Sequence, residues 1–212
     1  MFITFEGING SGKSTQAKLL YKYFLENGIQ SILTKGIGGG GEFCMEIRRI
    51  LCTTTDIDNL TELFLLYASR NEHVKNVLLP AIKEGKYIVC DRYVDSSYAY
   101  QCNGNAKMVE LLKTFHKAIQ APMPDITFFI DIPVAVSETR LAPLVYDAMV
   151  QGAGYKKYDE IKTEEMQKIV NNYKRLAEKF PERICRIDGM KTIKEIHNEI
   201  VDIIKAKMDV NN

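Results

Sequence analysis

The sequence has few of the features that mark secreted, membrane and nucleic-acid-binding proteins. It has no tryptophan, and its 5 cysteines are odd in number and form no C-x-x-C pair, which argues against a disulfide framework and a zinc site. No uncharged apolar run approaches the roughly 18 to 20 residues of a membrane helix, and a charge follows at Glu6, so we expect neither a membrane span nor a signal peptide. The formal net charge of +1 provides no broad basic surface for a nucleic acid polymer. We therefore expect a soluble, cytoplasmic protein that captures its ligand locally.

The composition is that of one globular domain over residues 1–212, with 46% hydrophobic and 26% charged residues. Short apolar runs alternate with longer amphipathic stretches, and no period repeats, which indicates an α/β fold with a parallel sheet between layers of helices. Five buried strands are expected, each rich in Ile, Val, Phe or Leu and bounded by charge or glycine: Phe2–Phe5, Ser31–Thr34, Tyr87–Cys90, Ile126–Ile130 and Ile184–Ile187.

Helical periodicity follows most of these runs. The first helix has apolar residues on one face and Gly28 as its natural stop, and a long helix begins after possible caps at Asp58 and Asn59, with Pro80 predicting a kink near its end. In the last helix Ile193, Ile196, Ile200 and Ile203 are spaced as a core stripe. The expected helices are Lys13–Glu26, Leu60–Glu84, Lys107–Ile119, Thr163–Lys179 and Thr192–Lys207.

Two stretches do not fit this scheme. Gly36–Gly41 directly follows a predicted strand, where α/β proteins place their ligand loops. Leu141–Tyr158 mixes proline, glycine and lysine with a weak helical pattern. It is interpreted as a mobile flap across a cleft, with a plain surface excursion as the alternative.

The segment from Gly7 to Ser14 reads G-I-N-G-S-G-K-S and matches GxxxxGK[ST] between a strand and a helix. Its glycines let backbone N–H groups converge on phosphate oxygens at the positive end of the helix dipole. Lys13 adds a charge for the β and γ phosphates, and the Ser14 hydroxyl suits the coordination shell of Mg²⁺. The motif predicts binding of a nucleoside triphosphate and leaves the acceptor open.

A carboxylate that orients magnesium is expected at the end of a buried strand, and both Asp91 and Asp131 qualify. Asp91 is favoured because Arg92 follows it, so one strand end presents a carboxylate for metal and a guanidinium for phosphate. Asp131 is interpreted as a cap of the following helix, with the metal role as the alternative.

Residues for an acceptor lie on the long helix and after the third strand. Leu66 and Arg70 are four residues apart, so an apolar surface and a forked donor share a face that suits a flat base, and His73 extends this face. The alternative is a core leucine beside a paired arginine. The segment from Arg92 to Gln101 adds hydroxyls and an amide.

The chain resembles the thymidylate kinases over nearly its whole length. The resemblance rests on residues 2–17, on the segments 60–63 and 67–70, on D-R-Y within residues 89–101, and on residues 172–177 and 181–184. It implies a P-loop kinase that moves the γ-phosphate of ATP to dTMP with Mg²⁺, and that forms homodimers through helices beside the sheet.

Carried over position by position, the resemblance implies three groups of site residues. The ATP-binding group is Gly7, Asn9, Gly10, Ser11, Gly12, Lys13, Ser14 and Thr15. The catalytic group is Lys13, Lys35, Asp91 and Arg92, with Ser14 and Asp91 holding the metal. The acceptor group is Asn9, Leu66, Arg70, Arg92, Ser97, Tyr100 and Gln101, with Arg92 on the phosphate and the last three residues near thymine and deoxyribose.

Four departures from the family pattern bear on catalysis. Asn9 replaces the usual aspartate, so a hydrogen bond to the sugar or a guanidinium survives without the charge. Residues 34–39 read T-K-G-I-G-G where the family reads T-R-E-P-G-G. Lys35 keeps the positive charge but not the planar fork of arginine, and Gly36 and Ile37 in place of glutamate and proline are expected to free the backbone. Leu66 stands where many relatives stack an aromatic ring. The flap has Lys156 and Lys157 where family lids carry arginines, and Lys157-Tyr-Asp159 replaces Arg-Phe-Glu.

Two hypotheses follow. The first is an ATP- and Mg²⁺-dependent thymidylate kinase that works by direct in-line transfer, without a covalent intermediate. The second is a nucleotide-binding P-loop protein with retuned acceptor choice or weakened transfer, because an arginine is sometimes worth 10³ or more in rate. A GTPase switch is a weaker third, since the chain has no N-K-x-D motif.

Overall fold

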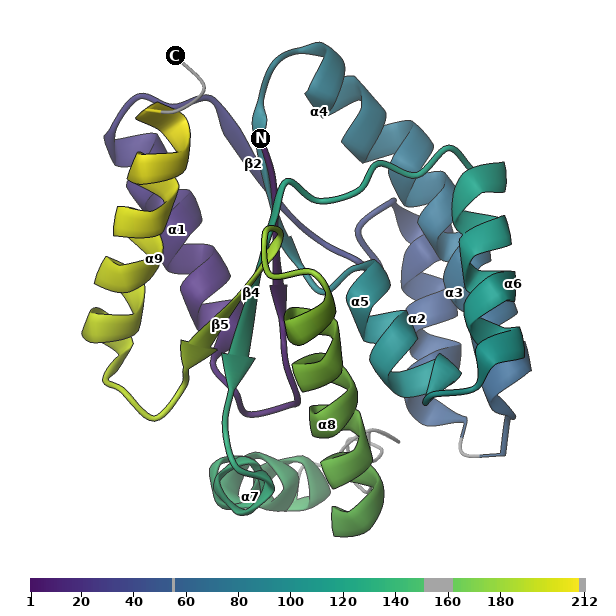
Figure 1. The fold of residues 1–212 in the computed structure, drawn as a ribbon. Helices are drawn as coiled ribbons and strands as arrows, with labels where there is room; N and C mark the ends of the chain where they lie inside the picture. Colours follow the sequence, from purple (N-terminus) through teal and green to yellow (C-terminus); the bar gives the residue numbers. More distant parts are fainter. Residues whose placement is uncertain (55, 151–161, 210–212) are drawn as a thin grey trace.

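The structure is a computed structural model that describes residues 1–54, 56–150 and 162–209 (Figure 1). Its centre is one parallel sheet of five strands in the order β2-β3-β1-β4-β5. The strands are β1 (Phe2–Glu6), β2 (Ser31–Lys35), β3 (Tyr87–Asp91), β4 (Ile126–Asp131) and β5 (Ile184–Asp188). This confirms the predicted α/β fold.

Each strand begins at its predicted residue and runs one residue further than predicted. The additional residues are all charged: Glu6, Lys35, Asp91, Asp131 and Asp188. The strands are parallel, so these residues lie along one edge of the sheet. The apolar pattern stops before the charged residue, whereas the backbone hydrogen bonds of the sheet include it, which explains the difference.

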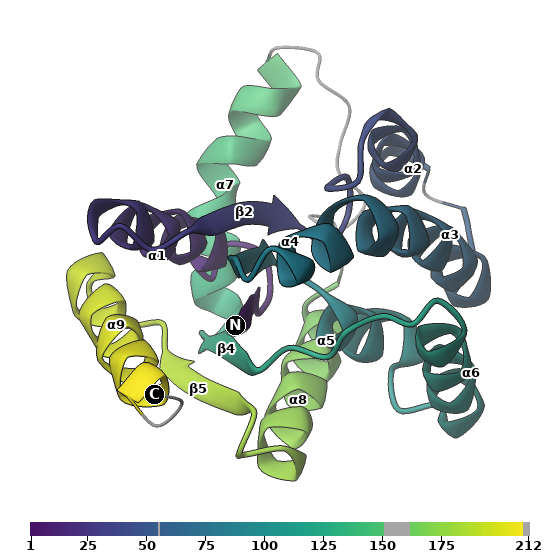
Figure 2. The ribbon, with the colours of Figure 1, turned by 90° about the horizontal axis from the view of Figure 1, so that it is seen from above.

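Helices cover both faces of the sheet (Figure 2). On one face lie α1 (Lys13–Glu26) and α9 (Ile193–Asp209), which bury Phe24 and Ile200 against the strands. Helices of the other face include α3 (Asn59–His73), α4 (Leu79–Lys83), α5 (Val94–Ser97), α6 (Ala106–Ala118) and α8 (Thr163–Lys179), with α2 (Glu42–Thr53) packed on α3. Helix α7 (Val134–Val150) lies beyond the carboxyl ends of β4 and β5 (Figure 1).

The predicted long helix is interrupted once. Asp58 caps α3 by accepting hydrogen bonds from the backbone N–H groups of Leu60 and Thr61, as expected. A π-helical turn, η1 (Val74–Leu78), then separates α3 from α4, whose first turn contains Pro80. Proline has no N–H and crowds the carbonyl four residues before it, so the wider turn explains how the chain stays helical through this position.

The sequence patterns missed several helical segments. These are α2, α5 with the π-helical turn η2 (Tyr98–Cys102), and α7. The first part of the flap expected over Leu141–Tyr158 is helical, because residues 141–150 continue α7 with Pro143 inside it, and the role of the segment as a flap stays a prediction. Residues 151–158 lie outside the described residues. The isoleucine stripe is also wrong at one position: Ile193 is 60% exposed, because α9 begins there, beyond the sheet core.

The other expectations on composition can be compared directly with the structure. All five cysteines lie in the described ranges and none forms a disulfide bond. Among the described residues no group of three or more His, Cys, Asp or Glu side chains is placed to hold a metal ion. No helix in the described parts of the chain has the length and apolar character to span a membrane.

Candidate active site

The loop between β1 and α1 has the geometry of a phosphate cradle. Its three successive carbonyls accept hydrogen bonds: Ile8 from the Lys13 Nζ at 3.3 Å, Asn9 from the Ser137 Oγ at 2.7 Å, and Gly10 from the Arg140 Nη1 at 3.2 Å. Gly12 precedes α1 in the left-handed region, with φ of 94°, and no side chain caps the helix. The N–H groups of the first turn of α1 therefore suit an anion.

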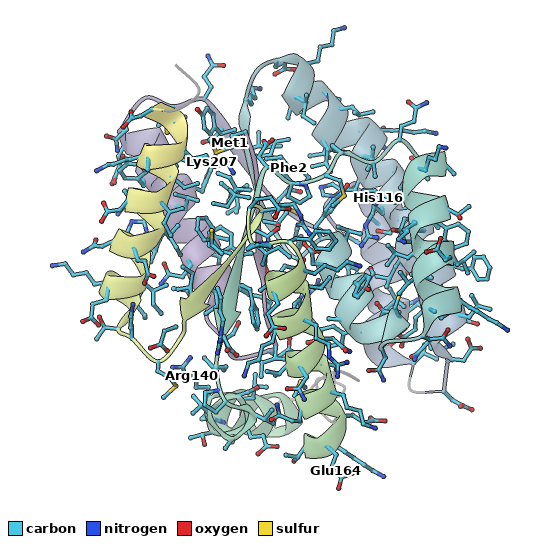
Figure 3. The ribbon with its side chains drawn as sticks, viewed as in Figure 1. Met1, Phe2, His116, Arg140, Glu164 and Lys207 are labelled. Atoms are coloured by element: carbon cyan, nitrogen blue, oxygen red, sulfur yellow. The ribbon has the colours of Figure 1, made fainter. Side chains whose placement is uncertain are left out.

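Close packing fixes the start of this loop. A Cβ atom at Gly7 would lie 2.6 Å from the Ile130 carbonyl oxygen of β4. A Cβ atom at Gly10 would lie 3.2 Å from the Ser137 carbonyl oxygen on α7, a less severe but still tight contact. Ser137 and Arg140, which the sequence analysis did not single out, therefore hold the loop from the side of α7, and Arg140 also donates to the Gly189 carbonyl at 3.2 Å. Figure 3 shows Arg140 at the end of the molecule opposite Met1.

Asp91 and the phosphate cradle face each other. In the register of β1 and β3, Phe5 pairs with Asp91, and the Ser14 hydroxyl donates a short hydrogen bond to the Asp91 Oδ2. The Asp91 Oδ1 is buried and has no hydrogen-bond partner among the described residues. A carboxylate oxygen and a hydroxyl side by side are hard oxygen ligands of the kind that Mg²⁺ prefers.

The alternative metal carboxylate, Asp131, is engaged elsewhere. Arg186 donates to its Oδ2 from Nε at 2.8 Å and approaches it with Nη2 at 2.6 Å, and the Lys174 Nζ lies 3.6 Å away. Two cations already neutralise this carboxylate, which favours Asp91 for the metal. Asp131 lies three residues before the start of α7, and its predicted role as a cap of that helix stays a prediction.

Arg92 is held on several sides. Its Nη2 donates to the Asn9 Oδ1 at 2.7 Å, so the hydrogen bond expected to survive the change from aspartate is present. Its backbone has φ of 67°, a left-handed conformation that is uncommon outside glycine and concentrates at functional sites. A Cβ atom at Gly36 would lie 2.3 Å from the Arg92 carbonyl oxygen. Glycine at position 36 is therefore required for a close approach to Arg92.

A buried carboxylate lies beneath Arg92 and was missed in the sequence analysis. Glu6 accepts hydrogen bonds from the backbone N–H groups of Tyr93 and Ser96, from the Ser96 hydroxyl at 2.5 Å and from the Tyr173 hydroxyl at 3.0 Å. Burial, followed by the nearby charge of Asp95, raises the pKa of Glu6, while Arg92 and the hydrogen bonds act in the opposite direction. The sequence signal was a charge directly after the strand residues Phe2-Ile-Thr-Phe5.

Arg70 is 2% exposed and lies between two tyrosine rings. Its guanidinium carbon lies 4.6 Å from the centroid of the Tyr67 ring and 5.2 Å from that of Tyr93. Its Nη2 donates to the Ser97 Oγ at 2.9 Å and to the Tyr93 carbonyl at 3.2 Å. The Nε and Nη1 atoms have no hydrogen-bond partner in the described structure, which is unusual for buried polar groups.

The remaining predicted acceptor residues differ in their surroundings: Tyr100 lies near Arg92, whereas Gln101 and Leu66 contact other residues. The Tyr100 ring lies 5.3 Å from the Arg92 guanidinium carbon, and Gln101 donates to the buried Glu62 at 2.9 Å. Leu66 is buried with Ile47 and Leu51 between α3 and α2, as in the core alternative. Contact of Leu66 with a base stays a prediction.

The glycine loop after β2 packs closely against α3. Lys35 is exposed and stands beside Asp91 in the register of β2 and β3. Cβ atoms at Gly39 and Gly40 would lie within 3 Å of His73, whose Nε2 forms a 2.8 Å hydrogen bond with the Thr34 Oγ1. Glycine is therefore needed at these positions because a side chain would collide with His73. The sequence analysis instead expected the glycines to leave the backbone free. Lys156 and Lys157 lie outside the described residues.

A glycine-rich phosphate loop between the first strand and first helix, with Asp91 at the end of the neighbouring strand, defines a P-loop nucleotide-binding protein. A family model described as thymidylate kinase matches residues 5–200. The chain is 39% identical over 207 residues to a thymidylate kinase of Wolbachia pipientis wMel, covering 96% of this chain and 100% of the relative. It is 35% identical to that of Orientia tsutsugamushi (strain Ikeda), covering 99% and 95%. The chain belongs to the thymidylate kinase family.

A solved structure supports the same assignment. The crystal structure of thymidylate kinase from Ehrlichia chaffeensis matches with a TM-score of 0.75 and 30% sequence identity. The match covers 97% of this chain and 98% of that chain. The likeness therefore extends over the whole fold, including the sheet edge where the predicted site residues meet.

The buried His73 gives the folded protein a pH dependence. Burial, with a contribution from Arg70, lowers the pKa of His73 to about 4, so the unfolded chain takes up the proton at higher pH than the folded one. Through His73 the free energy of unfolding should fall by roughly 2 kcal/mol between pH 7 and pH 5. Urea unfolding at both pH values should show that the free energy of unfolding falls by about 2 kcal/mol less in His73→Gln than in wild type. In the control His197→Gln, the fall should stay closer to that of wild type. An equal loss in wild type and His73→Gln would contradict it.

Proposed function

We propose that the protein is a thymidylate kinase that transfers the γ-phosphate of ATP to dTMP. The carrying observation is that the phosphate cradle and the Asp91–Arg92 pair meet at the ends of the adjacent strands β1 and β3. A donor phosphate on the cradle and an acceptor phosphate on Arg92 would then lie on the two sides of one transfer site. Direct transfer needs positioning and charge neutralisation, which Lys13 and Arg92 supply, and no covalent intermediate.

On the donor side, the residues of the cradle bind the ATP phosphates. Lys13 would reach the β and γ phosphates, and Lys35 lies near enough to Asp91 in the sheet register to add positive charge. Ser14 and Asp91 would hold Mg²⁺, which when bound neutralises phosphate charge and orients the transferring group. The unpartnered Asp91 Oδ1 supports this assignment.

On the acceptor side, the two arginines bind different parts of the nucleotide. Arg92 would bind the dTMP phosphate, and the unpartnered Nε and Nη1 of Arg70 would donate to an oxygen of the base. Ser97 orients Arg70 through its hydroxyl, while Tyr100 packs against Arg92. A thymine methyl group in an apolar surrounding adds discrimination of about 1 to 3 kcal/mol.

A panel of nucleoside monophosphates tests the acceptor. With labelled ATP and Mg²⁺, dTMP should be phosphorylated with a higher kcat/KM than dCMP, dUMP, dGMP or AMP, at a rate on the order of 1 to 100 s⁻¹. Preferred transfer to dCMP or AMP would overturn the acceptor assignment. Tight ATP binding without transfer to any of them would favour the second hypothesis, and recovery in Asn9→Asp with Lys35→Arg would trace the loss to these positions.

Replacement of Arg70 by methionine should separate stability from binding. Methionine keeps the packing between the tyrosine rings but removes a buried charge with unpartnered donors, so we expect the midpoint of thermal unfolding to stay the same or rise. The KM for dTMP should rise about 10- to 100-fold, which is the loss of a hydrogen bond from a charged donor. The KM for ATP should change less than about 2-fold. Equal effects on both KM values would contradict the assignment.

We infer a homodimer formed through α2 and α3, in the cytoplasm. Two large apolar side chains on α3 are exposed four residues apart, Leu60 at 41% and Phe64 at 53%, and Phe43 on the neighbouring α2 is 53% exposed. The Phe64 ring lies 5.4 Å from that of Phe115 on α6, so Phe64 continues an aromatic cluster at the surface. Exposed large apolar side chains on neighbouring helices favour a protein interface.

Charge substitutions should identify the dimer face. Light scattering after size exclusion should give wild type twice the chain mass of 24.1 kDa, and Phe64→Glu should give the mass of one chain. Ile82→Glu on α4 is the matched control, because Ile82 is 44% exposed but lies outside this face. Equal masses for Phe64→Glu and wild type would place the interface elsewhere or show a monomer.

A further inference from the structure

Three side chains from three distant segments meet beneath Arg92. Glu6 ends β1, Ser96 lies in α5, and Tyr173 lies in α8. The Arg92 Nη1 donates to the Ser96 Oγ at 3.1 Å and to the Tyr173 hydroxyl at 3.4 Å, and both hydroxyls lie within 3.0 Å of the Glu6 Oε2. Ser96 and Tyr173 also contact each other at 2.9 Å.

The direction of these bonds follows from the protons available. An ionised carboxylate only accepts hydrogen bonds, and each hydroxyl has one proton to give. When the Ser96 and Tyr173 protons point to Glu6, the lone pairs of both oxygens are left for Arg92. Burial, more than the charge of Glu6, raises the pKa of Tyr173 well above its usual value, so this hydroxyl keeps its proton.

The arrangement restricts Arg92 without using up its donors. A free arginine side chain carries about 2 kcal/mol of rotamer entropy, which a bound phosphate would otherwise have to overcome. The bonds to Asn9, Ser96 and Tyr173 occupy at most three of the five N–H donors of a guanidinium. At least two donors remain for a phosphate, and the backbone strain of Arg92 is supported by the surrounding contacts.

We propose that Glu6, Ser96 and Tyr173 form a positioning unit that orients Arg92 toward the acceptor phosphate, with Tyr173 as the positioning residue that couples α8 to the acceptor site. The inference rests on the proposed role of Arg92 in binding dTMP. It does not require Tyr173 or Glu6 to touch the nucleotide. Its consequence is selective: loss of the unit weakens recognition of the phosphate and leaves recognition of the nucleoside unchanged.

Tyr173→Phe tests the hydroxyl alone. The Tyr173 ring stacks on Phe129 with centroids 5.1 Å apart, and phenylalanine keeps this ring while it removes the hydroxyl. Calorimetry should show binding of dTMP weakened about 5- to 20-fold, with binding of thymidine, which has no phosphate, changed less than about 2-fold. Ser96→Ala should act in the same direction, and Ser96→Thr, which keeps the hydroxyl, should restore most of the affinity. Tyr87→Phe removes a hydroxyl at the opposite end of β3 and should leave both affinities unchanged.

A double-mutant cycle separates positioning from general damage. If Tyr173 acts through Arg92, Tyr173→Phe should add little to the loss already caused by Arg92→Lys. Additive losses, an equal loss of thymidine binding, or unchanged dTMP binding in Tyr173→Phe would each overturn the inference. Wild-type protein that binds dTMP without phosphorylating it would contradict the proposed function alone, because the comparison of dTMP with thymidine does not depend on transfer. Wild-type protein that does not bind dTMP would overturn both.

Discussion

The parallel pairing of β1 with β3 is the contact on which the site depends. It joins residues more than 80 positions apart and sets Phe5 opposite Asp91, so the phosphate loop that follows β1 and the Asp91–Arg92 pair leave the sheet at the same edge. A one-residue slip would turn the side chains of β3 to opposite faces and move Asp91 away from Ser14. The apolar residues of both strands are buried on both sides, which fixes this register at the same time as it builds the core.

Around this edge the structure accepts costs that a protein optimised for stability alone would avoid. Arg70 is a buried cation with unpartnered donors, Arg92 has a left-handed backbone, and Glu6 is a buried carboxylate. Each feature is stabilised by its neighbours. Tyrosine rings pack on both sides of Arg70, Gly36 leaves room for the Arg92 carbonyl, and four hydrogen-bond donors point at Glu6. Such local conflicts concentrate where a ligand binds, since the ligand supplies the missing partner.

Local patterns were sufficient for much of this outcome. The strands, α1, α8 and the phosphate loop follow from periodicity and one motif, because their signals lie within a few neighbouring residues. The contacts of Glu6 with Tyr173 span 167 positions, and nothing in either local sequence specifies them. The polar segment after Arg92 was interpreted only by its hydroxyls, so α5 and its π-helical turn were missed. Glycine at positions 36, 39 and 40 indicated freedom, whereas the constraint was the proximity of Arg92 and His73, which only the fold reveals.

The change from aspartate to Asn9 has a physical consequence beyond the loss of a charge. Asn9 still orients Arg92 through its Oδ1, but in the described part of the chain no carboxylate forms an ion pair with Arg92. The described hydrogen bonds connect Glu6 to the guanidinium through two hydroxyls, and the charges of Glu6 and Arg92 also act on each other electrostatically. An aspartate would compete with a phosphate dianion for Arg92, whereas an amide competes weakly. Orientation and charge are thus separated here: neutral oxygens hold the guanidinium in place, and under the proposed function its positive charge serves the acceptor phosphate.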